Sequence, residues 1–370
     1  MADKLSIQIL RRADLKTPGV YDRFDDPDQL AVPHPPKMRA LLENPLAGGD
    51  DEPAQLIGLS GNRVIGRMDL IPSEITVGSN APSRIFWGSH LIVPEPFRNT
   101  LMGVMLIMKA AGLGVAAGAF GPSQAALPVY QKLKWVDLPL TRHLLIVRSR
   151  PVVRRYVKNA VAAAALTAVA DTALAVWRLA INGWRAMRAR GLRIEPLQAA
   201  PAEWDAHFSA RTELVRIHRS ARFINWQLSN QFIDEPRSRN SLFNIRDHHG
   251  ETVGYFLNKV RFHETASHRG FKDVLLGSLQ DWMIFNPARL DMKTILLLSL
   301  GDLFSQGVNA VDFCTSDPTL RTTLKLIGFR QLGALNLLYK PQRGDSLADV
   351  QYHNLSKWWI RPGDGDNFFI

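Results

Sequence analysis

The residues best suited to chemistry lie in one short stretch, residues 92–103, which reads IVPEPFRNTLMG. Its two prolines end an apolar strand pattern, and an apolar helix pattern begins at Leu101, just after Arg98 and just before Gly103. The first main-chain N–H groups of a helix have no intrahelical partner, and the helix macrodipole is positive at that end. Such a helix start binds an anion without a cationic side chain. The stretch therefore predicts an anion site.

Other residues that could do chemistry lack a supporting pattern. Cys314 is the single cysteine, which excludes an internal disulfide and a Cys-rich zinc site, and no nucleophile motif surrounds it. His248 and His249 lie in a predicted turn, and His263 and His268 in a predicted loop. Neither pair has the spacing of zinc ligands, so no metal is expected. The lone cysteine and a charged N-terminus without an apolar core predict a reduced, cytoplasmic protein.

Two halves of the chain show the same order of elements. The first half predicts strands over 6–10, 55–59, 64–70, 84–93, 114–120 and 143–147, and helices over 36–42, 101–112 and 124–133. The second half predicts strands over 241–247, 252–262, 271–285, 308–314 and 333–339, and helices over 293–306 and 318–327. Each half contains a hairpin whose turn includes glycine, followed by the same strand–helix–strand–helix–strand order. The fold class is therefore α/β with a mixed sheet, in two tandem copies.

A basic segment separates the halves. Residues 148–193 contain ten basic residues and one acidic residue, which is a net charge of +9 out of the total of +11. The segment predicts one long alanine-rich helix from Pro151 to Gly191, weakest at Asn182-Gly183, that joins the halves. Its apolar stripe runs through Val161, Leu166, Val169, Ala173, Trp177, Ile181 and Trp184.

Two interpretations of this helix stay open. It could contact an anionic membrane surface from the cytoplasmic side, because arginines flank its apolar residues. It could instead pack between the two domains with its arginines in water. A transmembrane span fits poorly because the apolar run depends on alanine. Nucleic acid is an unlikely partner because base-stacking aromatic residues do not alternate with the basic ones.

Residues 92–103 resemble a motif of the GNAT superfamily of acyl-CoA-dependent acyltransferases. In that family a central strand ends in V-x-P-x-x-R, and a Q/R-x-x-G-x-G/A loop then opens a helix that binds the pyrophosphate of coenzyme A. The resemblance implies acetyl-CoA or another acyl-CoA as co-substrate. Leu101 stands where the family has its middle glycine. The implied binding residues are Val93, Arg98, Asn99, Thr100, Leu101, Met102 and Gly103.

A second family motif is similar to residues 123–135, SQAALPVYQKLKW. The family pattern is N-x-x-A-x-x-x-Y-x-x-x-G-F/W, with Ser123 and Lys134 standing here for its asparagine and glycine. The resemblance implies that Ser123 helps to bind the cofactor. It also implies that Tyr130 is the general acid that protonates the departing CoA thiolate. The alternative is that Tyr130 only packs on the sheet.

The general base is harder to assign. The strand that leads into Val93 contains His90, which is our candidate. Strand alternation places Trp87 and Ser89 on one face and His90 on the other. A bulge of the kind that the family has near the end of this strand would change that parity. The alternatives are that His90 is structural and that water relays the proton.

The second half is expected to keep the fold and lose the chemistry. Residues 289–294, RLDMKT, replace the phosphate loop, and they contain no glycine and an acidic Asp291. Leu324 stands where Tyr130 stands in the first half. Residues 222–227 (RFINWQ) resemble a Y-L-x-W-R-Y stretch of tandem GNAT acyltransferases. Residues 358–367 (WWIRPGDGDN) weakly resemble a tail of members from polysaccharide gene clusters, and the alternative is a tail docked by its aromatic residues.

These observations predict two GNAT-like domains in tandem, joined by a long basic helix. The expected boundaries are 1–147 for the catalytic domain, 148–193 for the helix, 194–342 for the degenerate domain and 343–370 for the tail. The expected activity is acyl transfer from acyl-CoA to an amine or hydroxyl, and a sugar or glycan precursor is the suggested acceptor. The alternative is an inactive tandem GNAT fold that acts as a binding or scaffold protein.

Overall fold

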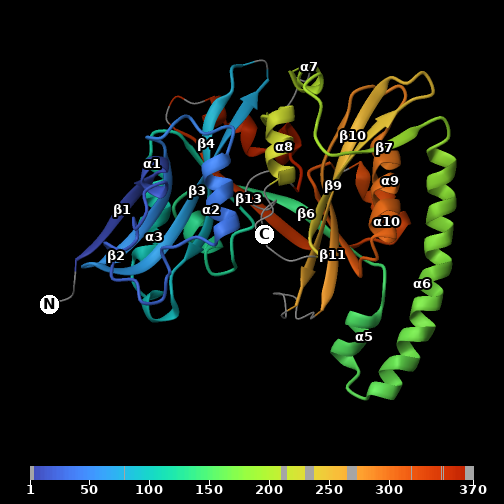
Figure 1. Cartoon of the computed structure of the whole chain (residues 1–370), viewed down its shortest axis with the longest axis horizontal. Coiled ribbons are helices and arrows are strands. Elements are labelled where there is room, and N and C mark those ends of the chain that lie inside the picture. The colour runs from blue at the N-terminus through green and yellow to red at the C-terminus, as the bar shows by residue number, and fades with distance from the viewer. Residues whose placement is uncertain are drawn as a thin grey trace. The chain divides into compact units, whose positions relative to one another are not determined.

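The computed structural model describes residues 4–78, 80–209, 215–229, 237–264, 273–317, 319–342, 344 and 346–362 of the 370-residue chain. The chain divides into two compact units, each built from separate stretches (Figure 1). Unit 1 comprises Met1–Leu140, Pro201–Phe232 and Leu335–Ile370, and unit 2 comprises Thr141–Ala200 and Ile233–Ala334. The contiguous domain boundaries expected from the sequence stay a prediction.

The first five strands of unit 1 lie in the sheet in the order in which they occur in the chain. Strands β1 (Leu5–Arg11), β2 (Pro53–Ser60), β3 (Arg63–Val77) and β4 (Ser83–Ile92) pair antiparallel in that order. Strand β4 pairs parallel with β5 (Ala116–Phe120), and β5 pairs antiparallel with the end of β13 (Arg330–Lys340). The β2–β3 turn contains Gly61 at a φ of 61°, which is a conformation that glycine adopts without steric cost.

Helices cover both faces of this sheet. On one face α3 (Met102–Ala111) and α4 (Leu127–Lys132) enclose a core that includes Leu56, Phe86 and Leu106. Helix α2 (Pro35–Glu43) contacts α8 (Ala221–Ser229), where the Trp226 indole N–H donates to the Ala40 carbonyl over 3.1 Å. The remaining elements of unit 1 are short: α1 (Arg12–Leu15), α7 (Trp204–Ser209), β8 (Val215–Ile217), β14 (Trp358–Trp359), η1 (Glu95–Phe97), η2 (Ser346–Ala348), η3 (Val350–His353) and η4 (Leu355–Lys357).

Unit 2 repeats the same pairing pattern. Strands β7 (Arg193–Leu197), β9 (Arg239–Arg246), β10 (Thr252–His263) and β11 (Val274–Ile284) pair antiparallel in that order. Strand β11 pairs parallel with β12 (Ala310–Thr315), which pairs antiparallel with β6 (Val136–Ile146). The mixed α/β class predicted from the sequence is confirmed.

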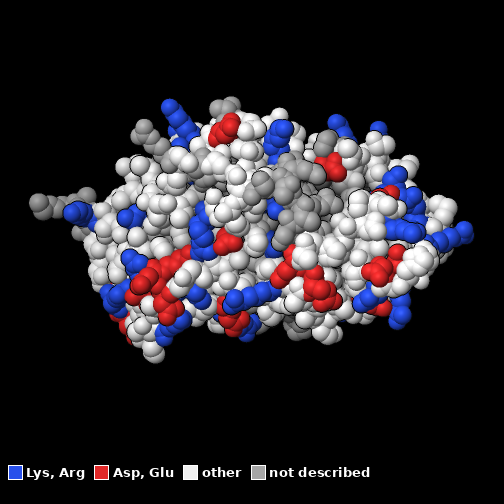
Figure 2. Space-filling view, turned by 90° about the horizontal axis from the view of Figure 1, so that it is seen from above, with Lys and Arg blue, Asp and Glu red and all other residues white. Residues whose placement is uncertain are grey.

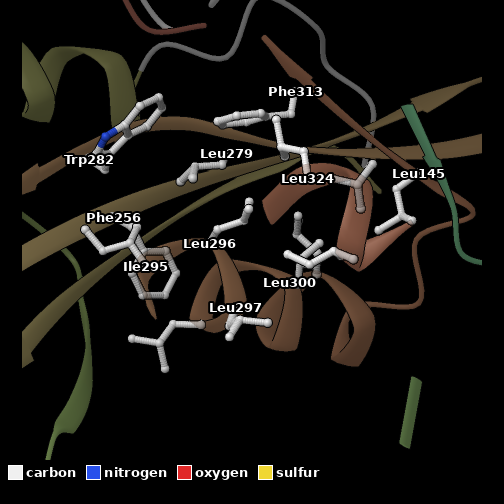
Figure 3. Packing of buried hydrophobic residues seen from close by; sticks show 14 of the residues in the cluster. Leu145, Phe256, Leu279, Trp282, Ile295, Leu296, Leu297, Leu300, Phe313 and Leu324 are labelled. Carbon is white, nitrogen blue, oxygen red and sulfur yellow. The ribbon is translucent and has the colours of Figure 1, made fainter. Parts of the chain in front are cut away.

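The core of unit 2 surrounds α9 (Met292–Ser305). Figure 3 shows Leu296 and Leu300 of this helix beside Leu324 of α10 (Leu320–Ile327) and Phe313 of β12. Helix α9 is apolar on most of its faces because the sheet lies on one side and a further helix, α6 (Ala160–Arg188), packs on another.

Each unit completes its sheet with a strand from the other half of the chain. Residues Leu337–Lys340 of β13 pair with β5 in unit 1, and residues Thr141–Ile146 of β6 pair with β12 in unit 2. The repeated order of strands and helices in the two halves could be predicted from the sequence. The exchange of the last strand could not.

The basic segment forms two helices, which corrects the prediction of one helix weakest at Asn182-Gly183. Helix α5 (Arg150–Tyr156) ends before Val157, and α6 (Ala160–Arg188) begins where the Asn159 side chain accepts from the Ala162 amide. Asparagine is a favoured N-cap, so a new helix starts there. Helix α6 continues through Gly183 because one glycine costs only about 1 kcal/mol in a helix that packs on its neighbours.

The surface charges are mixed on the face shown in Figure 2. Lys and Arg side chains lie among Asp and Glu side chains there, with wide uncharged areas between them. The described residues form no extended basic groove on this face of the kind that tracks a nucleic-acid backbone.

Candidate active site in unit 1

The sheet of unit 1 opens between β4 and β5. The two strands pair only from Ile85 to Trp87, and the last pair joins Trp87 to Gly118. Beyond Trp87, β4 continues to Ile92 and pairs in the described chain with β3 alone, so its other edge is open there. We call this opening the β4–β5 wedge. Main-chain N–H groups along an open strand edge can donate to a ligand carbonyl.

The indole of Trp87 marks the closed end of the wedge. A Cβ on Gly118 would lie 2.3 Å from a carbon of that ring, so only glycine fits beneath it. The Trp87 side chain is 1% exposed, and its indole N–H has no acceptor among the described residues.

Helix α3 begins next to the end of β4. Its N-cap, Leu101, provides no side-chain acceptor, and the Met102 amide donates weakly to the Thr100 hydroxyl over 3.3 Å. Within the described chain, the Gly103 and Val104 amides have no hydrogen-bond acceptor. Two donors at the positive end of a ten-residue helix therefore face outward.

The first turn of α3 is held firmly against the sheet. Met102 is fully buried, and Cβ atoms added to Gly58 and Gly66 would lie 2.2 and 2.9 Å from its side chain. The two glycines thus make room for Met102, which fixes the start of the helix over β2 and β3. Gly103 itself has room, because its notional Cβ would meet only Val93 at 3.8 Å.

The other residues predicted for the cofactor loop lie near this helix start. Arg98 and Asn99 are exposed, and Arg98 Nε donates to the Val93 carbonyl over 3.3 Å. Thr100 donates to the Phe97 carbonyl over 2.7 Å, which shapes the loop. The side chain of Leu101 is 67% exposed, so it extends into solvent and does not pack over the loop. The structure therefore places residues 93 and 98–103 together.

The second predicted motif forms a turn and the short helix α4, which packs on the core of unit 1. Ser123 is exposed, and its hydroxyl accepts from the Ala126 amide over 3.2 Å, so it shapes the turn that precedes α4. Tyr130 is 3% exposed and meets Trp135 edge-on at 4.8 Å between ring centroids. At this exposure the Tyr130 ring is shielded from solvent.

A bulge in β4 changes the expected position of His90. Ser89 pairs with Asp69 and Ile92 with Arg67, so β4 has one residue more than β3 between these pairs. His90 takes up the extra residue at a φ of 50°, in a region that is strained for a non-glycine residue. The prediction from plain alternation, with His90 and Ser89 on opposite faces, is wrong. The Ser89 hydroxyl and His90 Nδ1 lie 3.0 Å apart.

Behind the bulge lies a buried ionic cluster that the sequence analysis did not predict. Lys37 of α2 is 2% exposed, and its ammonium lies 2.5 Å from a carboxylate oxygen of Asp69 of β3, which is fully buried. The same ammonium donates to the Ser89 hydroxyl over 3.1 Å and contacts His90 Nδ1. We call Lys37, Asp69, Ser89 and His90 the β4 cluster.

Further polar groups hold the carboxylate of the β4 cluster in place. Gln55 donates to Asp69 over 3.0 Å and to the Ala31 carbonyl over 2.7 Å. Arg67 lies 3.5 Å from Asp69 and donates to two main-chain carbonyls over 2.9 Å. Asp69 is thus surrounded by donors, as a buried carboxylate must be if it is to stay ionised.

Burial and charge set the protonation states of the cluster. Burial, with a further contribution from the Lys37 charge, lowers the pKa of His90 from 6.5 to about 4. Burial alone would raise the pKa of Asp69, but the charges of Lys37 and Arg67 outweigh it, so that pKa is lowered. At neutral pH His90 is uncharged and Asp69 is ionised. Because Nδ1 of His90 faces the Lys37 ammonium, that nitrogen accepts and Nε2 carries the proton.

The sequence held one signal for this cluster. Arg67 and Asp69 are two residues apart on β3, so they share a face of an otherwise apolar strand that is buried almost throughout. Paired opposite charges at such positions indicate a buried ion pair. Lys37 gave no signal because a lysine in a short helix is usually exposed.

The other stretches that resembled family sequences also belong to unit 1. Residues 222–227 lie in α8, where Phe223, Trp226 and Gln227 are buried. In the tail, β14 pairs parallel with β8, and the Arg361 guanidinium lies 3.8 Å from the centroid of the Trp359 ring. The tail is thus docked by its aromatic residues up to residue 362, and the aspartates at 364 and 366 lie outside the described residues.

Comparison with known proteins gives structural neighbours and no sequence relative. No family model matches the sequence, and no curated protein gives a significant match. The structure of N-myristoyltransferase from Saccharomyces cerevisiae with bound myristoyl-CoA aligns with a TM-score of 0.54 at 10% identity, over 93% of this chain and 84% of that one.

Two further structures give similar values. A GCN5-related N-acetyltransferase from Anabaena variabilis aligns with a TM-score of 0.53 at 9% identity, over 91% of this chain and 73% of that one. A probable N-acyltransferase from Enterococcus faecalis aligns with a TM-score of 0.51 at 9% identity, over 91% and 72% of the two chains. The chain has the GNAT fold. Identities this low show the fold, and the activity must be argued from the site.

The second copy of the GNAT fold, in unit 2, closes the position that is open in unit 1. The Asp291 side chain caps α9 by accepting from the Thr294 amide over 2.8 Å, and it pairs with Arg188 of α6. Its carboxylate therefore occupies the place that an anionic ligand would take. Leu324, the counterpart of Tyr130, is fully buried in the apolar core (Figure 3).

Metal binding has no support in the described part of the chain. No group of three or more His, Cys, Asp or Glu side chains is arranged there to hold an ion. His248 and His249 stack with ring centroids 3.8 Å apart in the β9–β10 turn, Cys314 is buried, and His268 lies outside the described residues.

Proposed function

We propose that the chain is an acyl-CoA-dependent acyltransferase whose active site lies in unit 1. The observation that carries the proposal is the pair of amides of Gly103 and Val104, which have no acceptor among the described residues and lie at a helix start next to the β4–β5 wedge. These amides would bind the diphosphate of coenzyme A, and the exposed Arg98 would add positive charge. The GNAT fold and the resemblance of residues 92–103 support the same assignment.

The wedge supplies the electrophilic part of the reaction. The thioester carbonyl would accept from main-chain N–H groups of β4 near Val93, which stabilise the negative charge that develops on its oxygen. An amine or hydroxyl of the acceptor attacks the carbonyl carbon and forms the new C–N or C–O bond. The C–S bond then breaks, the electron pair leaves on the CoA sulfur, and the acceptor loses a proton.

The β4 cluster defines what His90 can do. Since Nδ1 accepts from Lys37, the imidazole presents an N–H at Nε2 and has no free lone pair there. We therefore assign His90 the role of a donor that positions the acceptor, and we assign the base to water, the alternative left open by the sequence. Lys37 and Asp69 act through His90 and are positioning residues.

The proposed general acid is Tyr130. Its burial means that the CoA sulfur would have to enter the protein to receive its proton, and in the described chain the β4–β5 wedge is an opening in the sheet that borders this core. A phenol carries its proton at neutral pH, as a proton donor to a thiolate requires.

The class of acceptor and the location of the protein complete the proposal. An amine or hydroxyl acceptor follows from the reaction type. A sugar or glycan precursor and a cytoplasmic location are carried over from the sequence analysis alone.

Binding of acyl-CoA to Gly103→Asp tests the proposal. The substitution adds an acidic group at the second residue of α3, where it favours the helix and meets no protein atom closer than ordinary contact distance. The apo protein should therefore melt at the same temperature or higher. Acetyl-CoA or myristoyl-CoA should raise the melting temperature of the wild type and leave that of the variant unchanged, because two negative groups would share one site.

The matched control is Lys293→Asp, which adds an acidic group at the second residue of α9 in unit 2. It should bind acyl-CoA as the wild type does. A wild type that binds neither acyl-CoA, measured by calorimetry, would establish the inactive binding or scaffold protein instead. Equal affinity of the wild type and Gly103→Asp for acyl-CoA would show that the binding site is not at the start of α3.

A further inference from the structure

Helix α6 carries an exposed apolar face. It is the one helix among the described residues that is long and apolar enough to cross a membrane by length and composition, with a mean hydropathy of 1.7 in its best 18-residue window. Only 6% of that window is buried. The large side chains on the outer face are well exposed: Val161 (80%), Val169 (73%), Leu179 (71%), Val176 (65%), Met187 (55%) and Leu166 (51%).

The charged side chains of α6 point the other way. Asp171 accepts from the Ser149 amide over 2.6 Å, and Arg178 donates to the Val147 carbonyl over 2.7 Å. Arg188 pairs with Asp291, and Arg185 lies against Gly301 of α9, where an added Cβ would clash with its guanidinium. Every exposed residue from Val161 to Met187 is uncharged. This is the reverse of the polarity of a helix on the surface of a water-soluble domain.

This polarity corrects the single apolar stripe predicted from the sequence. Trp177, Ile181 and Trp184 do pack on unit 2, with the Trp177 indole N–H donating to the Ile327 carbonyl over 3.1 Å. Val161 and Val169 lie on the opposite, exposed side. Arg178 donates to a main-chain carbonyl of its own unit and is partly buried, and Arg188 forms a surface ion pair with Asp291 of the same unit.

Cations flank the apolar face. Arg150, Arg154, Arg155 and Lys158 are exposed on or just after α5, and Tyr156 between them is 71% exposed. Arg190 and Arg193 are exposed beyond the other end of α6. Asp171 is the only acidic residue from 148 to 193, and it bonds inward. An uncharged apolar face between clusters of cations and an interfacial tyrosine complements an anionic lipid surface.

We propose that the outer face of α6 binds the surface of an anionic lipid bilayer, with the cations of α5 on lipid phosphates. Helix α6 lies along the surface and does not cross it, because its inner face stays bound to α9 and to Ile327. Such a helix buries its apolar face at the boundary of headgroups and acyl chains. The proposal is independent of the acyltransferase assignment, because no residue of unit 1 takes part.

Vesicle flotation of the full chain tests this proposal. The wild type should float with vesicles of phosphatidylcholine and phosphatidylglycerol and much less with phosphatidylcholine alone. Val169→Glu with Val176→Glu should lower the partition constant at least about tenfold, because two apolar groups of the outer face become charged. Arg154→Glu with Arg155→Glu should lower it by more than about tenfold on anionic vesicles only, since each cation near the surface contributes about fivefold.

The control is Leu326→Glu, which changes a leucine that is 70% exposed on α10 of the same unit. It should float as the wild type does, and circular dichroism should show that all variants are folded. Equal flotation of wild type and the α6 variant would overturn the proposal. Dimerisation that Val169→Glu with Val176→Glu abolishes would assign the face to a second copy, and membrane association that resists alkaline carbonate would show a spanning helix; either result overturns it.

Discussion

The starts of α3 and α9 occupy equivalent places in the two units and are built differently. Helix α3 begins at Leu101 without a side-chain cap and leaves the Gly103 and Val104 amides without acceptors in the described chain. Helix α9 begins at Asp291, whose carboxylate caps its own helix and binds Arg188. A helix start can satisfy its donors internally or keep them for a ligand. Unit 2 satisfies them internally, whereas unit 1 leaves two of them without an acceptor in the described chain.

The polar groups beside the equivalent strands differ in the same sense. Unit 1 buries Lys37 and Asp69 beside the β4 bulge, where they hold a strained histidine. Unit 2 buries hydrogen-bonded groups on the α9 side: Asn258 donates to Asp302 over 2.7 Å and accepts from Ser299 over 2.6 Å. Both clusters join a strand to a helix, but unit 1 does so with a buried ion pair that also contacts His90, whereas the unit 2 bonds are made by the amide of Asn258.

Breaking the ion pair of the β4 cluster should have the largest effect. Lys37→Met leaves Asp69 fully buried with Arg67 as its one remaining cation within 4 Å in the described chain. We expect the free energy of unfolding to fall by about 3–5 kcal/mol, measured by chemical denaturation. Lys16→Met breaks an exposed pair with Asp50 and should cost less than about 1 kcal/mol. Equal losses would show that the buried pair is not special.

Closing α3 in the manner of α9 should have the next largest effect. Leu101→Asp provides the missing cap and should stabilise the apo protein by about 1 kcal/mol. It should also weaken acyl-CoA binding by a factor of about 100, which corresponds to about 2.7 kcal/mol, because the carboxylate competes with the diphosphate. Isothermal titration measures this change. Leu101→Asn caps the helix without charge, and equal affinities of the two variants would contradict an electrostatic cause.

The protonation of His90 should appear as a pH dependence of stability. Its pKa falls from 6.5 in the unfolded chain to about 4 in the folded one, so the unfolded chain takes up a proton first as the pH falls. Stability due to this group is therefore present above pH 6.5 and is lost toward pH 4. Between pH 7 and pH 5 the loss is about 2 kcal/mol.

The matched variant for that measurement is His90→Asn, which should show a smaller loss over the same pH range. Chemical denaturation of both proteins at pH 7 and at pH 5 measures this loss. If both proteins lose the same stability, other histidines account for the change, and His90 is not held neutral.

Opening α9 should have the smallest effect. Asp291→Leu removes the cap on the Thr294 amide and the pairing with Arg188, which should cost about 1 kcal/mol. The stoichiometry of acyl-CoA binding should not change, because unit 2 would still lack the other two features. Its counterpart of Tyr130 is the apolar Leu324, and its counterpart of Gly103 is Lys293. A second equivalent of bound acyl-CoA would show that the Asp291 carboxylate alone closes this unit.

Local patterns predicted the repeated elements and the cofactor loop. The hairpins, the helix after residue 101 and the degenerate loop at residues 289–294 all depend on neighbouring residues, so one sequence suffices to find them. The Tyr130 prediction placed the residue in the right helix, but its 3% exposure depends on the core around it.

Long-range placement could not be predicted in the same way. Lys37 and Asp69 are 32 positions apart and meet only because α2 packs beside β3. The face of His90 depends on one extra residue in β4, and a single-residue shift reverses every side chain of a strand. The exposed face of α6 was mistaken for its packing face because alanine fits either environment.

The exchange of β6 and β13 makes the sheet of each copy depend on a strand from the other. A chain cut after residue 147 would lack the strand that covers β5, and a chain that began at residue 194 would lack the one beside β12. Neither fragment could close its own sheet, and each would expose a row of unsatisfied backbone groups prone to aggregation. Neither copy could therefore be deleted in evolution without opening the sheet of the other, since each unit takes its last strand from the other half of the chain.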